Sequence, residues 1–181
     1  MIRALAVVTV LAATAHTASA GVYGSLGLGN TGVETTDFNA REDSRSLRLA
    51  GGYEFTKYLS AEAGFMAYGV GLNSAQYDGR EFYAAGLVHV PIADGFWGFA
   101  RLGAQHTALT TSDNGPGLAG NGYLYGAGFE YRLKLPQIPV PHLGVWVDYT
   151  RNNATLTNQS RTNQTSDVGT SMWSLGVTVG L

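Results

Sequence analysis

The stretch S-L-R-L-A-G-G-Y-E-F-T-K-Y-L-S-A-E-A-G-F-M-A, residues 46–67, decides the fold. Over residues 47–55 it places apolar or small side chains at odd positions and polar or small side chains at even positions. After the link Thr56-Lys57 the alternation resumes over residues 59–67, again with the apolar side chains at odd positions. A period of two is typical of a strand with one apolar face, and two such runs joined by a short link predict a β-hairpin.

The same alternation continues along the rest of the chain. A second hairpin is predicted around the break Pro91-Ile92-Ala93-Asp94-Gly95, and a third pair of runs is separated by the segment Lys134 to Pro141. One further run lies near the beginning of the chain and one at its end. The eight predicted strands cover residues 22–30, 46–55, 59–68, 82–90, 96–105, 123–133, 143–149 and 172–181.

The connections between these strands alternate strictly between long and short. Polar connections of more than ten residues are predicted at 31–44, 69–79, 107–122 and 151–169, and tight or Pro-rich turns separate them. In an up-and-down barrel this alternation places every long loop at the outer surface and every turn, with both termini, in the periplasm. The sequence therefore predicts an all-β fold, an eight-stranded antiparallel up-and-down transmembrane β-barrel.

The composition favours a barrel in lipid over other classes of protein. Charged residues make up 13% of the chain, about half the usual share of roughly 25% in soluble domains, and there is no long apolar run. A helical membrane protein would need such runs, whereas a barrel distributes its apolar residues in alternation. Scattered Lys and Arg exclude an electrostatic footprint for nucleic acid, and the absence of cysteine excludes disulfides and thiolate metal sites.

The first twenty residues have the features of a cleavable secretory signal. Arg3 supplies a positive charge, residues 4–13 form an apolar stretch, and Ala18-Ser19-Ala20 is an A-x-A cleavage site. We therefore expect a signal peptide at 1–20 and a barrel domain at 21–181. Export followed by insertion of the barrel predicts the outer membrane of a Gram-negative cell envelope as its location.

Within the predicted strands, the few charged residues share one side with many glycines. A soluble lipocalin-like barrel or a sandwich would also alternate, but its charged side would be a solvated surface. Few charges of mixed sign fit better in a narrow lumen that ion pairs and small residues fill. The predicted lumenal ion-pair cluster consists of Arg48, Glu54, Glu62, Arg101, Glu130 and Asp148.

Aromatic residues near strand ends predict contacts with the membrane interface, where amphipathic rings are favoured. These residues are Tyr23, Tyr53, Tyr58, Tyr83, Tyr123, Tyr131, Trp97 and Trp173.

The last strand, S-M-W-S-L-G-V-T-V-G-L, is apolar on alternate positions and ends the sequence at Leu181. Such a terminal strand is similar to the signal that the outer-membrane assembly machinery reads, although the usual terminal Phe is a Leu here. An exposed edge of this kind would aggregate, and pairing with the first strand removes that liability. The predicted partners are therefore outer-membrane lipid and the assembly machinery; no surface ligand is indicated.

Several motifs resemble the OmpA-like transmembrane domains and other small, opacity-type outer-membrane barrels. F-A-R-L-G-A at 99–104, G-A-G-F-E-Y at 126–131 and S-L-G-V-T-V at 174–179 resemble the fifth, sixth and eighth strands of that family. Residues 51–65 are similar to its second-to-third strand hairpin. The resemblance implies that Arg48, Glu62, Arg101 and Glu130 form ion pairs that plug or gate a small pore, whereas a purely stabilising role is the simpler interpretation.

Three functions follow as hypotheses. The first is a non-enzymatic barrel with a structural, envelope-integrity or surface-interaction role and a pore that is at most narrow. The second is an outer-membrane enzyme that modifies lipid, with His106 beside Ser112 and Asp113, although no catalytic motif accompanies these residues. The third is a small diffusion channel. Histidines His89, His106 and His142 are too scattered to predict a metal site, and the sequence predicts no cofactor.

Overall fold

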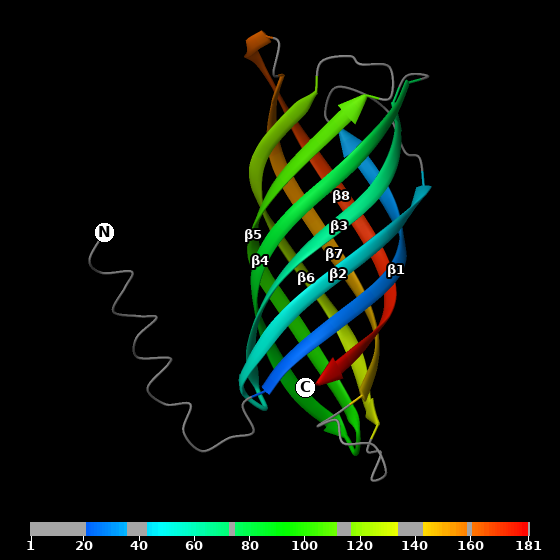
Figure 1. The fold of residues 1–181 in the computed structure, drawn as a ribbon, viewed down its shortest axis with the longest axis vertical. Helices are drawn as coiled ribbons and strands as arrows, with labels where there is room; N and C mark the ends of the chain where they lie inside the picture. Colours follow the sequence, from blue (N-terminus) through cyan, green and yellow to red (C-terminus); the bar gives the residue numbers. More distant parts are fainter. Residues whose placement is uncertain are drawn as a thin grey trace, which may run out of the picture.

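The chain forms a closed barrel of eight strands in the computed structural model (Figure 1). The structure describes residues 21–35, 43–72, 75–111, 117–133, 143–158 and 161–180, so the predicted signal peptide and Leu181 lie outside the described residues. Within these ranges no helix reaches the length and apolarity needed to cross a bilayer. The strands are β1 (Gly21–Thr35), β2 (Asp43–Thr56), β3 (Leu59–Leu72), β4 (Ala75–Ala93), β5 (Phe96–Thr111), β6 (Leu118–Leu133), β7 (Leu143–Asn158) and β8 (Arg161–Gly180).

Each strand pairs antiparallel with its neighbours in sequence, and β8 pairs with β1 to close the barrel. The closing register runs from Tyr23 opposite Gly180 to Thr35 opposite Val168. The predicted up-and-down topology and the pairing of the last strand with the first are therefore confirmed. Closure leaves no unpaired sheet edge along the paired lengths, which is what a bilayer requires of a β-structure.

Two of the predicted turns are tight in the structure. The Thr56 side-chain oxygen accepts hydrogen bonds from the backbone N–H groups of Tyr58 and Leu59, both at 3.1 Å. The second turn is shorter than predicted: β4 continues through Pro91 to Ala93, and Gly95 adopts a φ of 73°, which favours glycine. Pro91 is tolerated in the strand because the register shifts between Pro91 and Ala93, as at a β-bulge. We call this end of the barrel the turn end (lower end in Figure 1).

At the opposite end, which we call the hairpin end, the prediction of long loops is wrong. The connections predicted at 69–79, 107–122 and 151–169 consist mostly of strand, and half of the one predicted at 31–44 is strand, so that only residues 36–42, 73–74, 112–117 and 159–160 remain between strands. The β7–β8 ladder, for example, continues to Asn158 opposite Arg161. The outer face of this extension is polar, with Thr155 and Asp167 exposed, while its inner face holds a buried apolar cluster of Tyr68, Leu109, Ala154, Leu156 and Val168. The outward apolar alternation therefore disappears although the backbone ladder continues.

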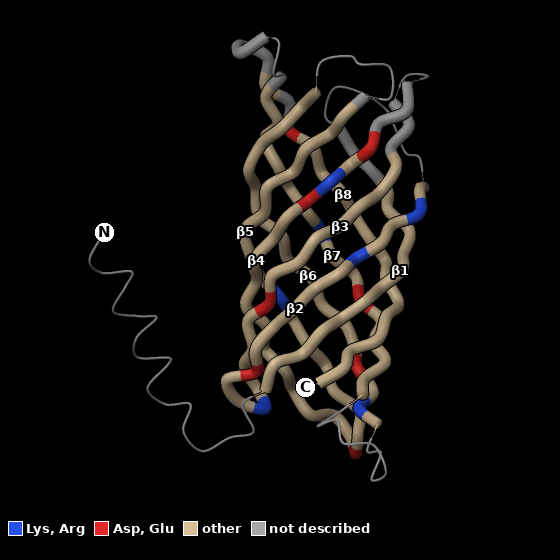
Figure 2. Tube along the Cα trace, viewed as in Figure 1, with Lys and Arg blue, Asp and Glu red and all other residues tan. Residues whose placement is uncertain are grey.

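The outer wall carries an apolar belt of the kind that faces lipid. Leu102, Trp173 and Leu175 are each more than 60% exposed, and charged residues are sparse along the strands (Figure 2). Tyr53, Tyr58, Tyr123, Tyr131 and Trp173 are exposed on it, as predicted. The interface prediction is wrong for Tyr23 and Tyr83, which point into the lumen and are buried, because alternation rather than position along the strand decides which side a ring occupies.

The lumen is closely packed, and glycines make room for large side chains. A Cβ atom on Gly27 or Gly176 would collide with the indole ring of Trp146, and one on Gly52 would collide with the ring of Tyr23. By contrast, a Cβ on the outward-facing Gly86 would meet nothing within 4 Å. Glycines on the inner face therefore determine which aromatic rings the narrow interior can hold.

Candidate functional site

The candidate site is a ring of four charges in the middle of the lumen. Arg48 of β2 and Arg101 of β5 each contact both Glu62 of β3 and Asp148 of β7. The Arg48 Nη1–Asp148 Oδ2 and Arg101 Nη1–Glu62 Oε1 distances are 2.8 and 2.9 Å. The other two ion pairs, Arg48 Nη2–Glu62 Oε1 and Arg101 Nη2–Asp148 Oδ2, measure 3.3 and 3.1 Å. We call these four residues the charge ring.

Two tyrosines and a tryptophan complete the charge ring. The Tyr83 hydroxyl accepts a hydrogen bond from Arg48 Nε and donates one to Glu62 Oε1, both at 3.0 Å. Tyr23 donates to Glu62 Oε2 at 3.3 Å. The guanidinium carbon of Arg48 lies 4.9 Å from the Trp146 ring centroid, within the range of a cation–π interaction. Glu62 thus receives bonds from two arginines and two tyrosines.

A second group of charges lies toward the turn end. Arg132 binds Glu130 through Nε at 2.7 Å and Glu54 through Nη2 at 3.0 Å. Its guanidinium also lies 4.8 Å from the Trp97 ring centroid and within 3.4 Å of His89 Nδ1. His89 Nε2 is in turn 2.9 Å from the Ser60 hydroxyl. We call Arg132, Glu54, Glu130 and His89 the mouth cluster.

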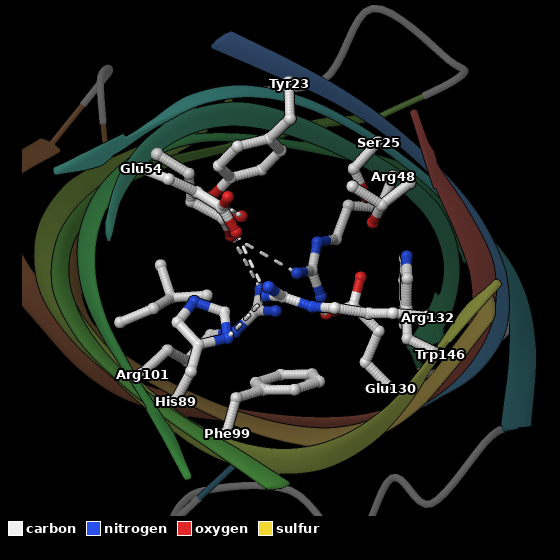
Figure 3. Close-up of a pocket in the computed structure, with 13 residues that line it drawn as sticks. Tyr23, Ser25, Arg48, Glu54, His89, Phe99, Arg101, Glu130, Arg132 and Trp146 are labelled. Carbon is white, nitrogen blue, oxygen red and sulfur yellow. Dashed lines mark hydrogen bonds and ion pairs between the residues drawn. The ribbon is translucent and has the colours of Figure 1, made fainter. Parts of the chain in front are cut away.

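All six residues of the predicted lumenal set have buried side chains inside the barrel, but they do not form one cluster. The structure brings Arg48, Glu62, Arg101 and Asp148 together and places Glu54 and Glu130 in the mouth cluster. Figure 3 shows the labelled side chains converging from opposite sides of the wall.

Sequence reasoning missed the cation that joins Glu54 to Glu130. Arg132 lies two residues after Glu130 on β6, so period two places both on the lumen side. This two-residue spacing from Glu130 is the feature of the sequence that could have identified Arg132 as a lumenal residue. The bonds from Tyr23 and Tyr83 had no comparable signal, because which inward ring reaches which carboxylate depends on the stagger of the strands around the barrel.

The space between the charge ring and the mouth cluster is small. The cavity there measures about 30 Å³ and is lined by Tyr23, Arg48, Glu62, Arg101 and Arg132 among others. That volume holds roughly one or two water molecules. Side chains therefore fill most of the lumen at this level, as expected for eight strands.

The charge ring alternates groups of opposite sign. Two guanidiniums face two carboxylates, so the ring is neutral overall, and all four side chains are at most 3% exposed. Burial makes each isolated charge costly, and the pairing with additional hydroxyl bonds offsets that cost. Removing one member would leave each of its two partners with a single counter-charge and give the buried ring a net charge.

The features expected of an enzyme or a metal centre do not come together in the described part of the chain. No group of three or more His, Asp or Glu side chains there is arranged to hold a metal ion. His106 is exposed on the outer wall, with Nδ1 2.8 Å from Asn121 Oδ1. The catalytic partners suggested for it, Ser112 and Asp113, and also His142, lie outside the described residues.

A closed eight-stranded barrel with an apolar outer belt and a charge-filled lumen defines the class of small outer-membrane barrels. The sequence matches the outer membrane protein beta-barrel domain over residues 3–180. The chain belongs to this family and is an outer-membrane protein.

Solved structures of other outer-membrane proteins share the fold. Neisserial surface protein A (NspA) is 16% identical, with a TM-score of 0.68 over 89% of this chain and 98% of that one. Ail, the attachment invasion locus protein of Yersinia pestis, is 18% identical, with a TM-score of 0.57 over 89% and 99%. OprG of Pseudomonas aeruginosa is 13% identical, with a TM-score of 0.51 over 92% and 97%. The comparison with curated proteins gave no significant match.

Proposed function

We propose that this protein is a non-enzymatic outer-membrane barrel with a plugged lumen, which acts in the envelope as a structural and surface-contact element. The observation that carries the proposal is the charge ring, which joins four different strands across the lumen. Large buried side chains, among them Met66, Leu124 and Trp146, pack close to it. A lumen filled in this way supports a role that depends on the wall and the ends of the barrel.

Planar-bilayer recording tests whether the charge ring closes the lumen to ions. The native protein is expected to give no discrete current steps even at high protein load, because its lumen is filled at the charge ring. The double variant Glu62→Ala/Arg101→Ala removes one charge of each sign together with two long side chains, and it is expected to give measurable steps.

The matched control for this recording is Arg45→Ala, which truncates an exposed arginine in β2. This variant, like the native protein, should give no discrete current steps. Discrete steps from the native protein, of a size similar to those of the double variant, would contradict the proposal and support the small diffusion channel instead.

The hairpin end supports a surface-contact role in particular. The strands there contain 14–20 residues, although a tilted strand needs only about 9–11 to cross the bilayer. By the usual orientation of such barrels, the excess length projects outside the cell. It carries a polar groove of about 620 Å³ on the outer wall of β6, β7 and β8, lined by Asn121, Arg151, Asn153, Thr155 and Asp167 among others. The structure of Ail in complex with the heparin analogue sucrose octasulfate has the same fold, with a TM-score of 0.58 at 18% identity.

A complementation experiment separates the envelope role from the surface role. Asn153 and Gly169 lie opposite each other in the β7–β8 ladder, so residues 154–168 can be replaced by an Asn-Gly turn without changing the register. In a bacterium that lacks the protein, the native and shortened chains are expected to restore detergent resistance equally, while only the native chain restores adhesion to host-cell monolayers. Equal adhesion by both chains would refute a surface role for this hairpin. A heat-dependent gel shift checks that both barrels are folded.

A further inference from the structure

The buried charges of the lumen do not balance within the described residues. Five carboxylates, those of Glu54, Glu62, Glu81, Glu130 and Asp148, face three guanidiniums, those of Arg48, Arg101 and Arg132. The charge ring is neutral, and the mouth cluster contains Arg132 and the imidazole of His89. The remaining carboxylate belongs to Glu81, which lies outside both groups. Sequence analysis missed it because the predicted fourth strand begins one residue later, at Phe82.

Glu81 is completely buried, and no described basic side chain forms an ion pair with it. Its Oε2 accepts a hydrogen bond from Asn152 Nδ2 at 3.2 Å, and its Oε1 has no hydrogen-bond partner. The three bonds of the Arg48 guanidinium go to Tyr83, Asp148 and Glu62. An ionised carboxylate in this position would be costly unless another group neutralised it.

Three further buried polar side chains lie at inward positions near this carboxylate. Thr107 lies directly opposite Glu81 in the β4–β5 ladder, and Gln105 is the next inward residue of β5. Asn152 reaches Glu81 from β7 on another side of the barrel. Gln105 Oε1 and Asn152 Oδ1 have no hydrogen-bond partner, the Thr107 hydroxyl lies within hydrogen-bonding reach of Glu81, and the three side chains are at most 5% exposed. A carboxylate, two amides and a hydroxyl thus occupy neighbouring inward positions of β4, β5 and β7.

We propose that Glu81, Thr107, Asn152 and Gln105 form a site for a hard monovalent cation such as Na⁺. Oxygen donors without nitrogen or sulfur are the ligands that hard cations prefer. A single carboxylate neutralises a single positive charge, whereas a divalent ion would leave an excess charge buried. The bound cation would join β4, β5 and β7 on the hairpin side of the charge ring, independently of whether the lumen conducts.

The test is the thermal unfolding midpoint of the refolded protein in detergent micelles, measured by the heat-dependent gel shift. NaCl is exchanged for N-methyl-D-glucamine chloride at constant total chloride, so that ionic strength does not change. A ligand that binds only the folded state raises the midpoint as its concentration increases. The native midpoint is expected to rise with Na⁺, and the Glu81→Gln midpoint is expected to be the same in both salts.

The matched control is Asp78→Asn, an exposed carboxylate three residues earlier on the same strand, which should keep the Na⁺ dependence of the native protein. A native midpoint that is equal in both salts would overturn the proposal and indicate a protonated Glu81. If Glu81→Gln does not fold, Thr107→Val serves in its place and should weaken the Na⁺ dependence. Excess ²³Na line width, present with native micelles and reduced by either variant, provides a second measurement; the absence of this excess would also overturn the proposal.

Discussion

An Arg48→Ala variant is expected to lose about 3–5 kcal/mol of unfolding free energy, the cost of removing one partner from a buried ion-pair network. The substitution leaves Asp148 with a single arginine and removes both the hydrogen bond to Tyr83 and the cation–π contact with Trp146. Urea titration of the protein refolded into lipid vesicles, followed by the shift between folded and unfolded gel bands, measures this loss.

Two further variants show whether the loss comes from the buried network. Arg45→Ala truncates an exposed arginine three residues earlier on β2 and should change the unfolding free energy by less than about 0.5 kcal/mol. Arg48→Lys keeps the charge but not the planar set of donors, so its loss should be intermediate. A loss below about 1 kcal/mol for Arg48→Ala would mean that the charge ring contributes little to stability.

A Leu102→Arg variant is expected to lose about 2–4 kcal/mol, the cost of a lipid-facing arginine near the middle of the bilayer. Leu102 is 67% exposed on β5, between the aromatic Phe96 toward the turn end and the polar His106 toward the hairpin end. The same urea titration in vesicles measures the loss. Because the Leu102 side chain points outward and is 67% exposed, the loss reports the position of the bilayer and not a disturbed lumen.

Thr110→Arg is the depth control for this measurement. Thr110 is exposed on the same face of the same strand, eight residues closer to the hairpin end. If the bilayer surrounds the apolar belt, an arginine at this position contacts water or headgroups, and its cost should be close to zero. Equal losses at the two positions would place the bilayer elsewhere along the barrel.

The sequence could predict which side chains of each strand point outward, because side chains that contact lipid have to be apolar. Wherever the outer wall faces hydrocarbon, outward positions are apolar and charged residues lie at inward ones, so the parity of Leu47 and Leu49 determines the direction of Arg48 between them. The same argument places Glu62, Arg101 and Asp148 inside. The eight-stranded closed topology follows from the number of runs and from the terminal strand.

The lengths of the strands and the grouping of the inward charges could not be predicted in this way, because the alternation of apolar residues does not give the contacts between strands. Beyond the belt the outer face of the wall is polar, so β7 and β8 continue to Asn158 and from Arg161 without the outward apolar alternation that marks a lipid-facing strand. The division into a charge ring and a mouth cluster depends on strand stagger, which sets which inward residues share a level. The burial of Tyr83 against Glu62 follows from the same stagger.

The ion pair between Arg48 and Asp148 joins residues that are 100 positions apart in the chain. Arg48 finds its first partner, Glu62, on the adjacent strand β3, but Arg101 of β5 contacts the same carboxylate. Before β7 is in place, two guanidiniums would therefore share one carboxylate of the ring, and Asp148 supplies the second negative charge. The charge balance of the lumen is thus a property of the complete barrel, which a shorter set of strands would not have.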